Sequence, residues 1–506
     1  MSRRIGVILS YVLMIFEVLS TLLLTPFIIR TLGQAEYGVY KLVAAVNAYL
    51  LLLDLGVGNA VIRYIAKYRI SGDREKERQF LGVATIFYGM VAIIAVVVGS
   101  GLVAIFPTAF ARGLSASEIR LGQTLLGITM LNSAISLGTA AYNNILIAYE
   151  RFAISRGMSI IQIFFRMGLT CLTLSLGYGS VGIVLINLLT TVCGRGFFVG
   201  YVLRQLKLRP LFRGIEFSFV KEIVAYSSLI LVQMIATQLN ATVDQILIGS
   251  LVNASAVILA VYGVGTQIVQ YYQSIGSAFG GVLMPGVVRL VEGGASAKEL
   301  TNEMIRVGRI TFIMLAMIWC GFAVFGKEFI CLWAGNENRE AYGVALILMS
   351  VYTFILSEAI GTQILWAKNL HKEQAILKIV IVLINILLTI VLIKWNPLIG
   401  ATIGTFCSLM LGDVGVMNWI FRKQLKIDLV YYYRELLRGI VPCAFITVIA
   451  GIIIRRLLPS GWIWLCVKLL CIVVIYGIVM LKFGMSSYER KLVLSIVNRA
   501  KVRRNN

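Results

Sequence analysis

Long apolar runs alternate with short polar and basic segments along the whole chain. A helix needs about twenty apolar residues to cross the roughly 30 Å of hydrocarbon in a bilayer, and about fourteen runs reach that length. The pattern therefore predicts an all-α integral membrane protein whose polar segments connect successive spans. The expected spans are 5–29, 39–62, 80–106, 119–147, 157–178, 181–203, 223–250, 257–285, 308–331, 341–366, 375–393, 398–421, 440–458 and 461–483.

A loose internal repeat suggests how these spans are grouped. The segment 27–40 has an echo at 246–262, six spans further along the chain. Repeated halves are common in alternating-access transporters, which hold their substrate between the halves. We therefore expect two six-helix lobes and two added helices. The predicted divisions are an N-terminal lobe at 1–203, a C-terminal lobe at 204–421, an interfacial helix with two spans at 422–483, and a basic tail at 484–506.

Composition excludes several other classes of protein. The chain is 59% hydrophobic and only 14% charged, so a water-soluble core cannot bury its apolar surface. Its net charge of +23 does not indicate nucleic-acid binding, because the basic residues lie in short tracts between apolar runs. The eight cysteines show neither a CxxC motif nor a paired spacing, so we expect no metal site and no disulfide framework.

The distribution of Lys and Arg predicts the orientation. Most of the 46 basic residues fall on one side if the N-terminus is cytoplasmic, as the positive-inside rule requires. Both termini and the loop at 63–78 are then cytoplasmic. The segments 426–438 and 488–504 are amphipathic and basic, and we expect them to lie on the headgroups of membrane lipids.

Several predicted spans carry polar stripes along one helical face. Polar side chains in hydrocarbon usually face a bundle interior or a hydrated cavity. So many stripes favour a shared hydrated cavity lined by amides that can bind a polar substrate, and hydrogen bonds between helices are the alternative. The amides of these stripes are Gln233, Asn240, Gln267, Gln270, Asn132 and Asn143.

Two arginines are the candidate ligands for an anion. Arg166 and Arg195 fall about 12–15 Å from the cytoplasmic ends of successive antiparallel spans. A guanidinium suits phosphate because its planar fork donates two hydrogen bonds and stays charged. An internal salt bridge with Asp54 and snorkelling toward the inner interface are the alternatives.

Carboxylates within the spans are candidates for ion coupling. A buried carboxylate in a membrane binds Na⁺ or a proton, or serves as a structural hydrogen-bond acceptor. The sequence leaves these roles open. The candidates are Glu17, Asp54, Asp244, Glu358 and Asp413.

The residues at 26–38 and 54–64 carry a family resemblance. The runs Pro26-Phe27-Ile28-Ile29-Arg30 and Asp54-Leu55-Gly56-Val57-Gly58-Asn59-Ala60, with Arg63-Tyr64, resemble the start of Wzx-type oligosaccharide flippases. These form the polysaccharide transport branch of the superfamily that also contains MATE drug exporters and lipid II flippases. The resemblance implies two lobes, spans one to six and seven to twelve, that rock between inward-open and outward-open states in a bacterial or archaeal cell (inner) membrane.

The resemblance and the residues together predict a function. The implied cargo is a polyprenyl-diphosphate-linked oligosaccharide, moved from the inner to the outer leaflet for cell-surface polysaccharide biosynthesis, with other polysaccharide assembly proteins as partners. We expect no enzyme activity, no cofactor and no bound metal. The sequence leaves open whether a Na⁺ or H⁺ gradient, or the membrane potential, drives transport. The alternatives are a MATE-type exporter of organic cations and an integral-membrane glycosyltransferase or polysaccharide polymerase.

Overall fold

The computed structural model describes residues 3–54, 56–213, 217–368 and 370–491, with side chains except at 3–8, 11, 217–233, 278–289, 292, 371–373 and 375. Within these ranges the chain forms helices and turns and contains no strand. The helices belong to two compact units, Met1–Gly263 and Val264–Asn506. The predicted lobes end at different positions, 203 and 421, and stay a prediction.

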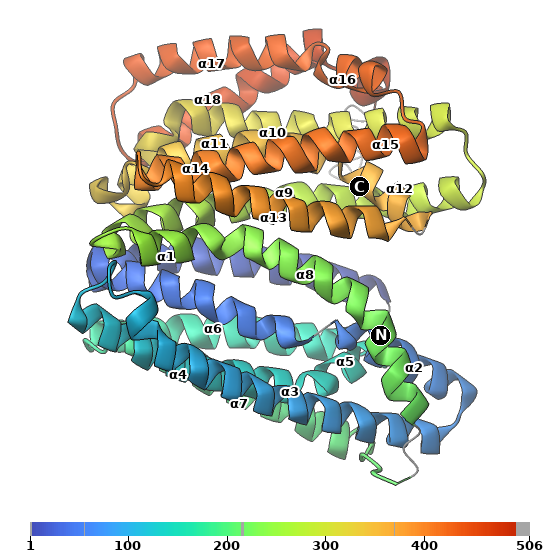
Figure 1. Ribbon diagram of the computed structural model, residues 1–506. Helices are drawn as coiled ribbons and strands as arrows, with labels where there is room; N and C mark the ends of the chain where they lie inside the picture. Colours follow the sequence, from blue (N-terminus) through green and yellow to red (C-terminus); the bar gives the residue numbers. More distant parts are fainter. Residues whose placement is uncertain (1–2, 55, 214–216, 369, 492–506) are drawn as a thin grey trace, which may run out of the picture. The chain divides into compact units, whose positions relative to one another are not determined.

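The first unit contains helices whose neighbours in sequence pack side by side, with α3 on α4 and α6 on α7 (Figure 1). Its helices are α1 (Arg3–Leu51), α2 (Val57–Ser71), α3 (Arg74–Ala109), α4 (Ala116–Gly138), α5 (Ala140–Ala148), α6 (Phe152–Ser175), α7 (Gly179–Arg204) and α8 (Phe217–Leu251), with the 3₁₀ turn η1 (Leu52–Asp54) and the start of α9 (Ser255–Glu292).

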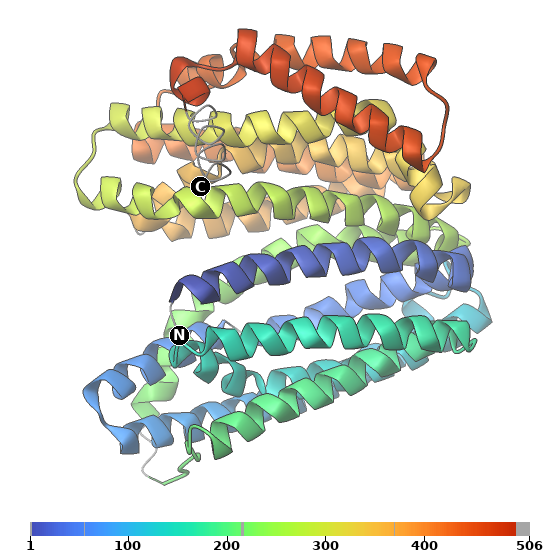
Figure 2. The ribbon, with the colours of Figure 1, turned by 180° about the vertical axis from the view of Figure 1, so that it is seen from behind.

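In the second unit, α13 packs on its sequence neighbour α14, and α10 packs on its sequence neighbour α11. Helix α10 also packs on α16, α17 and α18, which come later in the chain. Figure 2 shows this unit from behind, in yellow-green to red. Its helices are the rest of α9, α10 (Ala297–Ala334), α11 (Ala341–Ser357), α12 (Ala359–Ala367), α13 (His371–Leu392), α14 (Pro397–Leu409), α15 (Met417–Leu425), α16 (Leu429–Leu437), α17 (Ile440–Leu457) and α18 (Trp462–Val479), with η2 (Asn336–Asn338), η3 (Met410–Val416) and η4 (Met480–Gly484).

Nine helical segments of the described chain are long and apolar enough to cross a membrane, or ten if α11 and α12 form one bent span. The first of them, Val12–Ser71, overlaps the two predicted spans 5–29 and 39–62, and between these spans the backbone leaves the helical conformation at Gly33 (φ 75°, ψ 172°). Each of the fourteen predicted spans overlaps a helix. The prediction of an all-α, multi-span membrane protein is therefore confirmed.

Polar residues at the ends of the runs start several helices. Ser115 and Ser296 form capping boxes with the glutamates three residues on, which satisfy backbone N–H groups that have no partner within the helix. Asn396 caps α14, where Pro397 occupies the first turn. Asp73 caps α3, and the hydrogen bond from the Lys76 backbone N–H lowers the pKa of its carboxyl.

Three spans are interrupted at predicted site residues. The 3₁₀ turn η1 ends in Asp54, and Gly56, two residues further on, adopts a positive φ of 70°. Glu358 separates α11 from α12, which are bent by 40°. Asp413 lies in the π-helical segment η3. Such interruptions free backbone groups and re-aim side chains, and they are frequent at functional positions.

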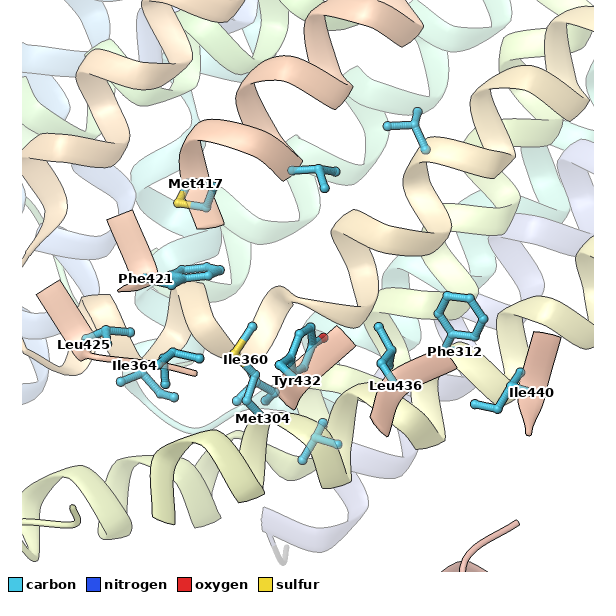
Figure 3. Packing of buried hydrophobic residues seen from close by; sticks show 14 of the residues in the cluster. Met304, Phe312, Ile360, Ile364, Met417, Phe421, Leu425, Tyr432, Leu436 and Ile440 are labelled. Carbon is cyan, nitrogen blue, oxygen red and sulfur yellow. The ribbon is translucent and has the colours of Figure 1, made fainter. Parts of the chain in front are cut away.

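The second unit has a large apolar core near the ends of α10, α12, α15 and α16. Met304, Ile360, Phe421 and Tyr432 are each at most 2% exposed and come from these four helices. Figure 3 shows them converging with Leu436. The amphipathic segment predicted at 426–438 is thus helix α16, held on one face by this core.

Candidate functional site

Arg195 lies in the interior of the first unit, on α7. Its guanidinium is half-buried, and one Nη donates a hydrogen bond to Ser136 Oγ on α4 at 2.8 Å. The two helices pack closely along their length. Arg195 is therefore held by a neutral hydroxyl, which leaves its positive charge uncompensated at hydrogen-bond distance.

Asp54 and Tyr88 complete the surroundings of Arg195. Tyr88 Oη, on α3, donates to Asp54 Oδ1 at 2.9 Å, and the Gly56 backbone N–H also hydrogen bonds to this carboxylate. Asp54 and Arg195 interact electrostatically. In the described part of the chain, however, no carboxylate oxygen lies within 4.0 Å of the Arg195 guanidinium. The salt bridge with Asp54 considered from the sequence is thus not formed at contact distance.

Arg166 is exposed on α6, the neighbour of α7. It acts electrostatically on Tyr40, and it too has no carboxylate within 4.0 Å among the residues described. Gln162 donates to the Thr190 carbonyl at 2.9 Å and lies against Gly194. Gln162 and Gly194 therefore lie at the same height on two antiparallel helices. Arg166 lies four residues after Gln162 on α6. Arg195 lies one residue after Gly194 on α7, which runs in the opposite direction. The two Cα positions are thus offset by five residues, about 7.5 Å along the helices.

Helix α4 carries amide and hydroxyl side chains near Ser136, the residue that binds Arg195. Asn132, one turn before Ser136, has a buried Oδ1 without a hydrogen-bond partner in the described structure. Ser133 Oγ donates to Asn47 Oδ1 at 3.0 Å. Buried polar atoms are normally satisfied, so the orphaned Asn132 oxygen marks a place for water or a ligand hydroxyl. Asn143, on α5, instead accepts a hydrogen bond from Ser155 Oγ at 3.0 Å.

The candidates on α8 and α9 have different surroundings. Asp244 is buried and accepts a hydrogen bond from Tyr262 Oη at 2.6 Å. Asn240 is half-buried, whereas the side chain of Gln233 falls outside the described part of the structure. Gln267 and Gln270 belong to the second unit. Gln267 is buried and donates to Tyr271 Oη at 2.6 Å, and Gln270 is exposed.

The other carboxylates divide between paired and exposed positions. Lys378 on α13 donates to both carboxylate oxygens of Asp413, at 2.6 and 2.7 Å. Asn418 donates to Glu358 Oε2 at 3.0 Å, and Tyr433 of α16 donates to Oε1. Glu17 is exposed on α1. Asp413 is therefore neutralised locally, and Glu358 is held by two neutral donors.

Several charged residues with defined roles were missed by the sequence analysis. Lys378 is the only charged residue of the predicted span 375–393, and Lys468 lies within the predicted span 461–483, far from the other basic residue, Lys482, at its end; this isolation was the available signal. Lys468 is 1% exposed and donates to Glu328 at 2.7 Å. Lys41, another lone cation in a span, lies 5.3 Å from the centre of the Tyr37 ring. The partners of Lys378 and Lys468 could not be identified without the packing of the helices, whereas Tyr37 lies four residues before Lys41 on the same helix.

The arrangement of the first unit suits an anion. It combines a half-buried guanidinium, an exposed second arginine on the neighbouring helix and an amide oxygen, and among the described residues the guanidinium has no ion-pair partner and the oxygen no hydrogen-bond partner. A guanidinium in such a setting gains more from a charge-assisted hydrogen bond than it would in water. The candidate site is therefore the cluster of Arg195, Ser136, Asp54, Tyr88 and Asn132, which we call the arginine cluster.

Solved structures show the same fold. A lipid II flippase MurJ in an inward-closed conformation aligns with a TM-score of 0.73 over 97% of this chain and 99% of that chain, at 14% identity. An inward-facing multidrug resistance MATE family transporter aligns with a TM-score of 0.59 over 80% and 98%, at 15% identity. A MOP superfamily transporter from Pyrococcus furiosus gives 0.52 over 83% and 96%, at 17% identity.

Sequence comparisons give the family. No curated protein sequence matches the chain. The model of the family described as "Polysaccharide biosynthesis protein" matches residues 5–291, more than half of the 506 residues. The resemblance drawn from residues 26–38 and 54–64 is confirmed, and so is the MATE-like fold. The chain belongs to the polysaccharide biosynthesis protein family, and its fold is that of the MurJ and MATE transporters.

Proposed function

We propose that this protein is a flippase that moves a polyprenyl-diphosphate-linked oligosaccharide from the inner to the outer leaflet of the cell membrane by alternating access. The product would serve cell-surface polysaccharide biosynthesis. The family match and the likeness to a protein described as a lipid II flippase support a lipid-linked cargo. In this proposal both termini are cytoplasmic, and other polysaccharide assembly proteins supply and remove the lipid-linked glycan.

The observation that carries the proposal is the state of Arg195. A diphosphate and several sugars cannot enter hydrocarbon without replacement of their hydration shell. Arg195 supplies charge-assisted donors inside the first unit, and among the described residues no carboxylate at ion-pair distance competes for them. Asn132 adds an acceptor for a hydroxyl. Together they offer what a sugar diphosphate needs, while the lipid tail stays in the bilayer.

The same structure gives less support to a cation exporter. Such a protein needs carboxylates free to bind an organic cation or a coupling ion. Asp413 is neutralised by Lys378, and Asp54 and Asp244 each accept a tyrosine hydroxyl. The flippase is therefore the function that we propose, without an enzymatic step.

Substitution of Arg195 tests this proposal. Arg195→Ala should lower the transport of a lipid-linked glycan about ten- to a hundredfold, because a lost charge-assisted contact costs about 1.5–3 kcal/mol. Arg195→Lys should retain part of the activity, because it keeps the charge and loses the fork, and Arg195→Gln should not. The measurement is glycan delivery to the outer leaflet, normalised to folded protein.

The matched control is Arg456→Ala. Arg456 is exposed at the end of α17 and has no ion-pair partner in the part of the chain that is described. Its removal should leave transport unchanged. Normal transport by folded Arg195→Ala would refute the diphosphate role, and a loss of folded protein that Asp54→Asn restores would identify Arg195 as a structural partner instead.

A further inference from the structure

Helix α16 has two faces with different surroundings. Tyr432 and Leu436 on one face are fully buried in the apolar core of the second unit (Figure 3). On the other face Val430 is 79% exposed and Tyr431 45% exposed. The helix lies where α15 ends and α17 begins, at one end of the second unit (Figure 1). An amphipathic helix between two spans has the geometry of a segment that lies in the membrane interface.

The exposed surface around α16 is strongly basic. Arg422, Lys423, Lys426 and Arg434 are all exposed, and within the described chain none of them has a carboxylate within 4.0 Å. Lys423 lies over the ring of Trp419, which is 57% exposed. Unpaired cations interleaved with exposed aromatic and aliphatic side chains fit anionic headgroups and the acyl chains beneath them. We call these four residues the basic corner.

The buried face of the same helix holds the break in the span formed by α11 and α12. Tyr432 Oη donates to the Ser357 carbonyl at 3.1 Å, and Tyr433 Oη donates to Glu358 Oε1. Asn418, on α15, donates to Glu358 Oε2 at 3.0 Å and to Tyr433 Oη at 2.7 Å. Two consecutive tyrosines thus hold the two residues at which α11 and α12 are bent by 40°.

We propose that the basic corner is a binding surface for anionic phospholipid headgroups, and that its occupation holds the break at Ser357 and Glu358 in the bent conformation through Tyr432 and Tyr433. The charge of the surface selects the lipid. The connection is short, because Arg434 follows Tyr433 directly in the sequence. A headgroup that fixes α16 at the membrane surface therefore also fixes the donors to Glu358. This inference does not depend on which molecule the protein transports.

Lipid binding can be measured without any transport substrate. The protein is reconstituted in vesicles of phosphatidylcholine that contain spin-labelled phosphatidylglycerol or spin-labelled phosphatidylcholine, and the relative association of each label is compared. Wild type should prefer phosphatidylglycerol several-fold. The variant Arg422→Gln, Lys423→Gln, Lys426→Gln, Arg434→Gln should lose this preference. The matched control replaces four exposed basic residues elsewhere, Arg112, Arg120, Lys394 and Arg456, with glutamine and should keep it.

The connection to the break is measured by hydrogen exchange of the amides at 355–361. In wild type these amides should exchange about three- to tenfold more slowly in phosphatidylglycerol than in phosphatidylcholine, because opening then requires about 0.6–1.4 kcal/mol more. Tyr432→Phe with Tyr433→Phe should bind phosphatidylglycerol like wild type and lose this difference.

The proposal is overturned if the four-glutamine variant keeps its lipid preference, if soluble glycerophosphate displaces the lipid, or if the double phenylalanine variant still shows lipid-dependent exchange. A negative result in either measurement would not count against the proposed transport function, because neither measurement uses the transport substrate.

Discussion

In the first unit Arg195 is held by the hydroxyl of Ser136, whereas in the second unit Lys378 and Lys468 each donate to a carboxylate at 2.7 Å or less. All three cations lie within predicted spans, where an isolated charge is costly. The lysines of the second unit are neutralised inside the protein. Their role is to join helices, α13 to η3 and α18 to α10, whereas Arg195 has no carboxylate at ion-pair distance among the described residues.

This difference has an energetic consequence. Removing one partner of a buried pair leaves the other charge uncompensated, so the pair matters mainly to the stability of the fold. Removing a cation that has no ion-pair partner leaves no uncompensated charge in the protein. The substitution then weakens the binding of the ligand that the cation contacts. Variants of the two units should therefore separate stability from activity.

The largest effect is expected at Lys468. Lys468→Met should lower the free energy of unfolding by about 3–5 kcal/mol. The reason is that the largely buried Glu328 carboxylate then keeps its negative charge without the ammonium group that compensates it. Adding Glu328→Gln should restore most of the loss. Thermal unfolding of purified protein measures both, and Lys394→Met, at an exposed position, should change stability by no more than about 0.5 kcal/mol. A stable Lys468→Met variant would contradict the structural role assigned to the pair.

A smaller effect, on binding alone, is expected at Asp54. Asp54→Asn removes a negative charge near Arg195 and keeps an oxygen that accepts the Tyr88 hydrogen bond. The affinity for a short prenyl diphosphate should rise about fivefold, since a charge at this range contributes on the order of 1 kcal/mol. Titration calorimetry with farnesyl diphosphate measures it, and farnesol, which lacks the diphosphate, should show no change. Weaker binding by the folded variant would indicate that Asp54 itself contacts the ligand.

The sequence was sufficient to predict the helices, but it was not sufficient to predict where they are interrupted. Apolar length is a local property, so each predicted span overlaps a helix, and the pattern Ser115 to Glu118 marks a helix start in the sequence itself. The glycines that follow the 3₁₀ turn at Leu52–Asp54, and those within the π-helical segment at Met410–Val416, permit a break without specifying one. The positions of the breaks follow from packing between helices that are distant in the sequence.

The same limit applies to the charges. The sequence identified Asp413 as buried in a span, and the lone Lys378 was visible in another, but their pairing across 35 residues requires the fold. It also proposed an equal depth for Arg166 and Arg195, whereas the contact of Gln162 with Gly194 offsets their positions along the helices. Depth counted from the end of a predicted span ignores how neighbouring helices are shifted along each other when they pack, and that shift is visible only in the fold.

An effect that depends on pH is expected at Glu489, outside the spans, where a buried ion pair can be titrated. Arg309 donates through Nε to Glu489 Oε1 at 2.6 Å, and it also donates to the carbonyls of Arg438 and Gly484. Burial acts to raise the pKa of the Glu489 carboxyl, but the hydrogen bonds from Arg309 and from the Ser486 backbone N–H, together with the charge of Arg309, outweigh it and hold the pKa below its ordinary value. The unfolded chain therefore binds the proton more readily than the folded protein does.

It follows that the stabilisation by Glu489 is complete above the unfolded pKa of about 4.3 and is lost as the pH falls through the lower folded pKa. Glu489→Gln should cost about 1–2 kcal/mol at pH 7, because the amide still accepts from Arg309 without the charge. The difference from wild type should shrink as the pH falls below about 4.3. Unfolding midpoints of both proteins across this range measure it. A difference that stays constant down to the lowest pH would show that packing of the segment after α18, and not the ion pair, holds it against α10.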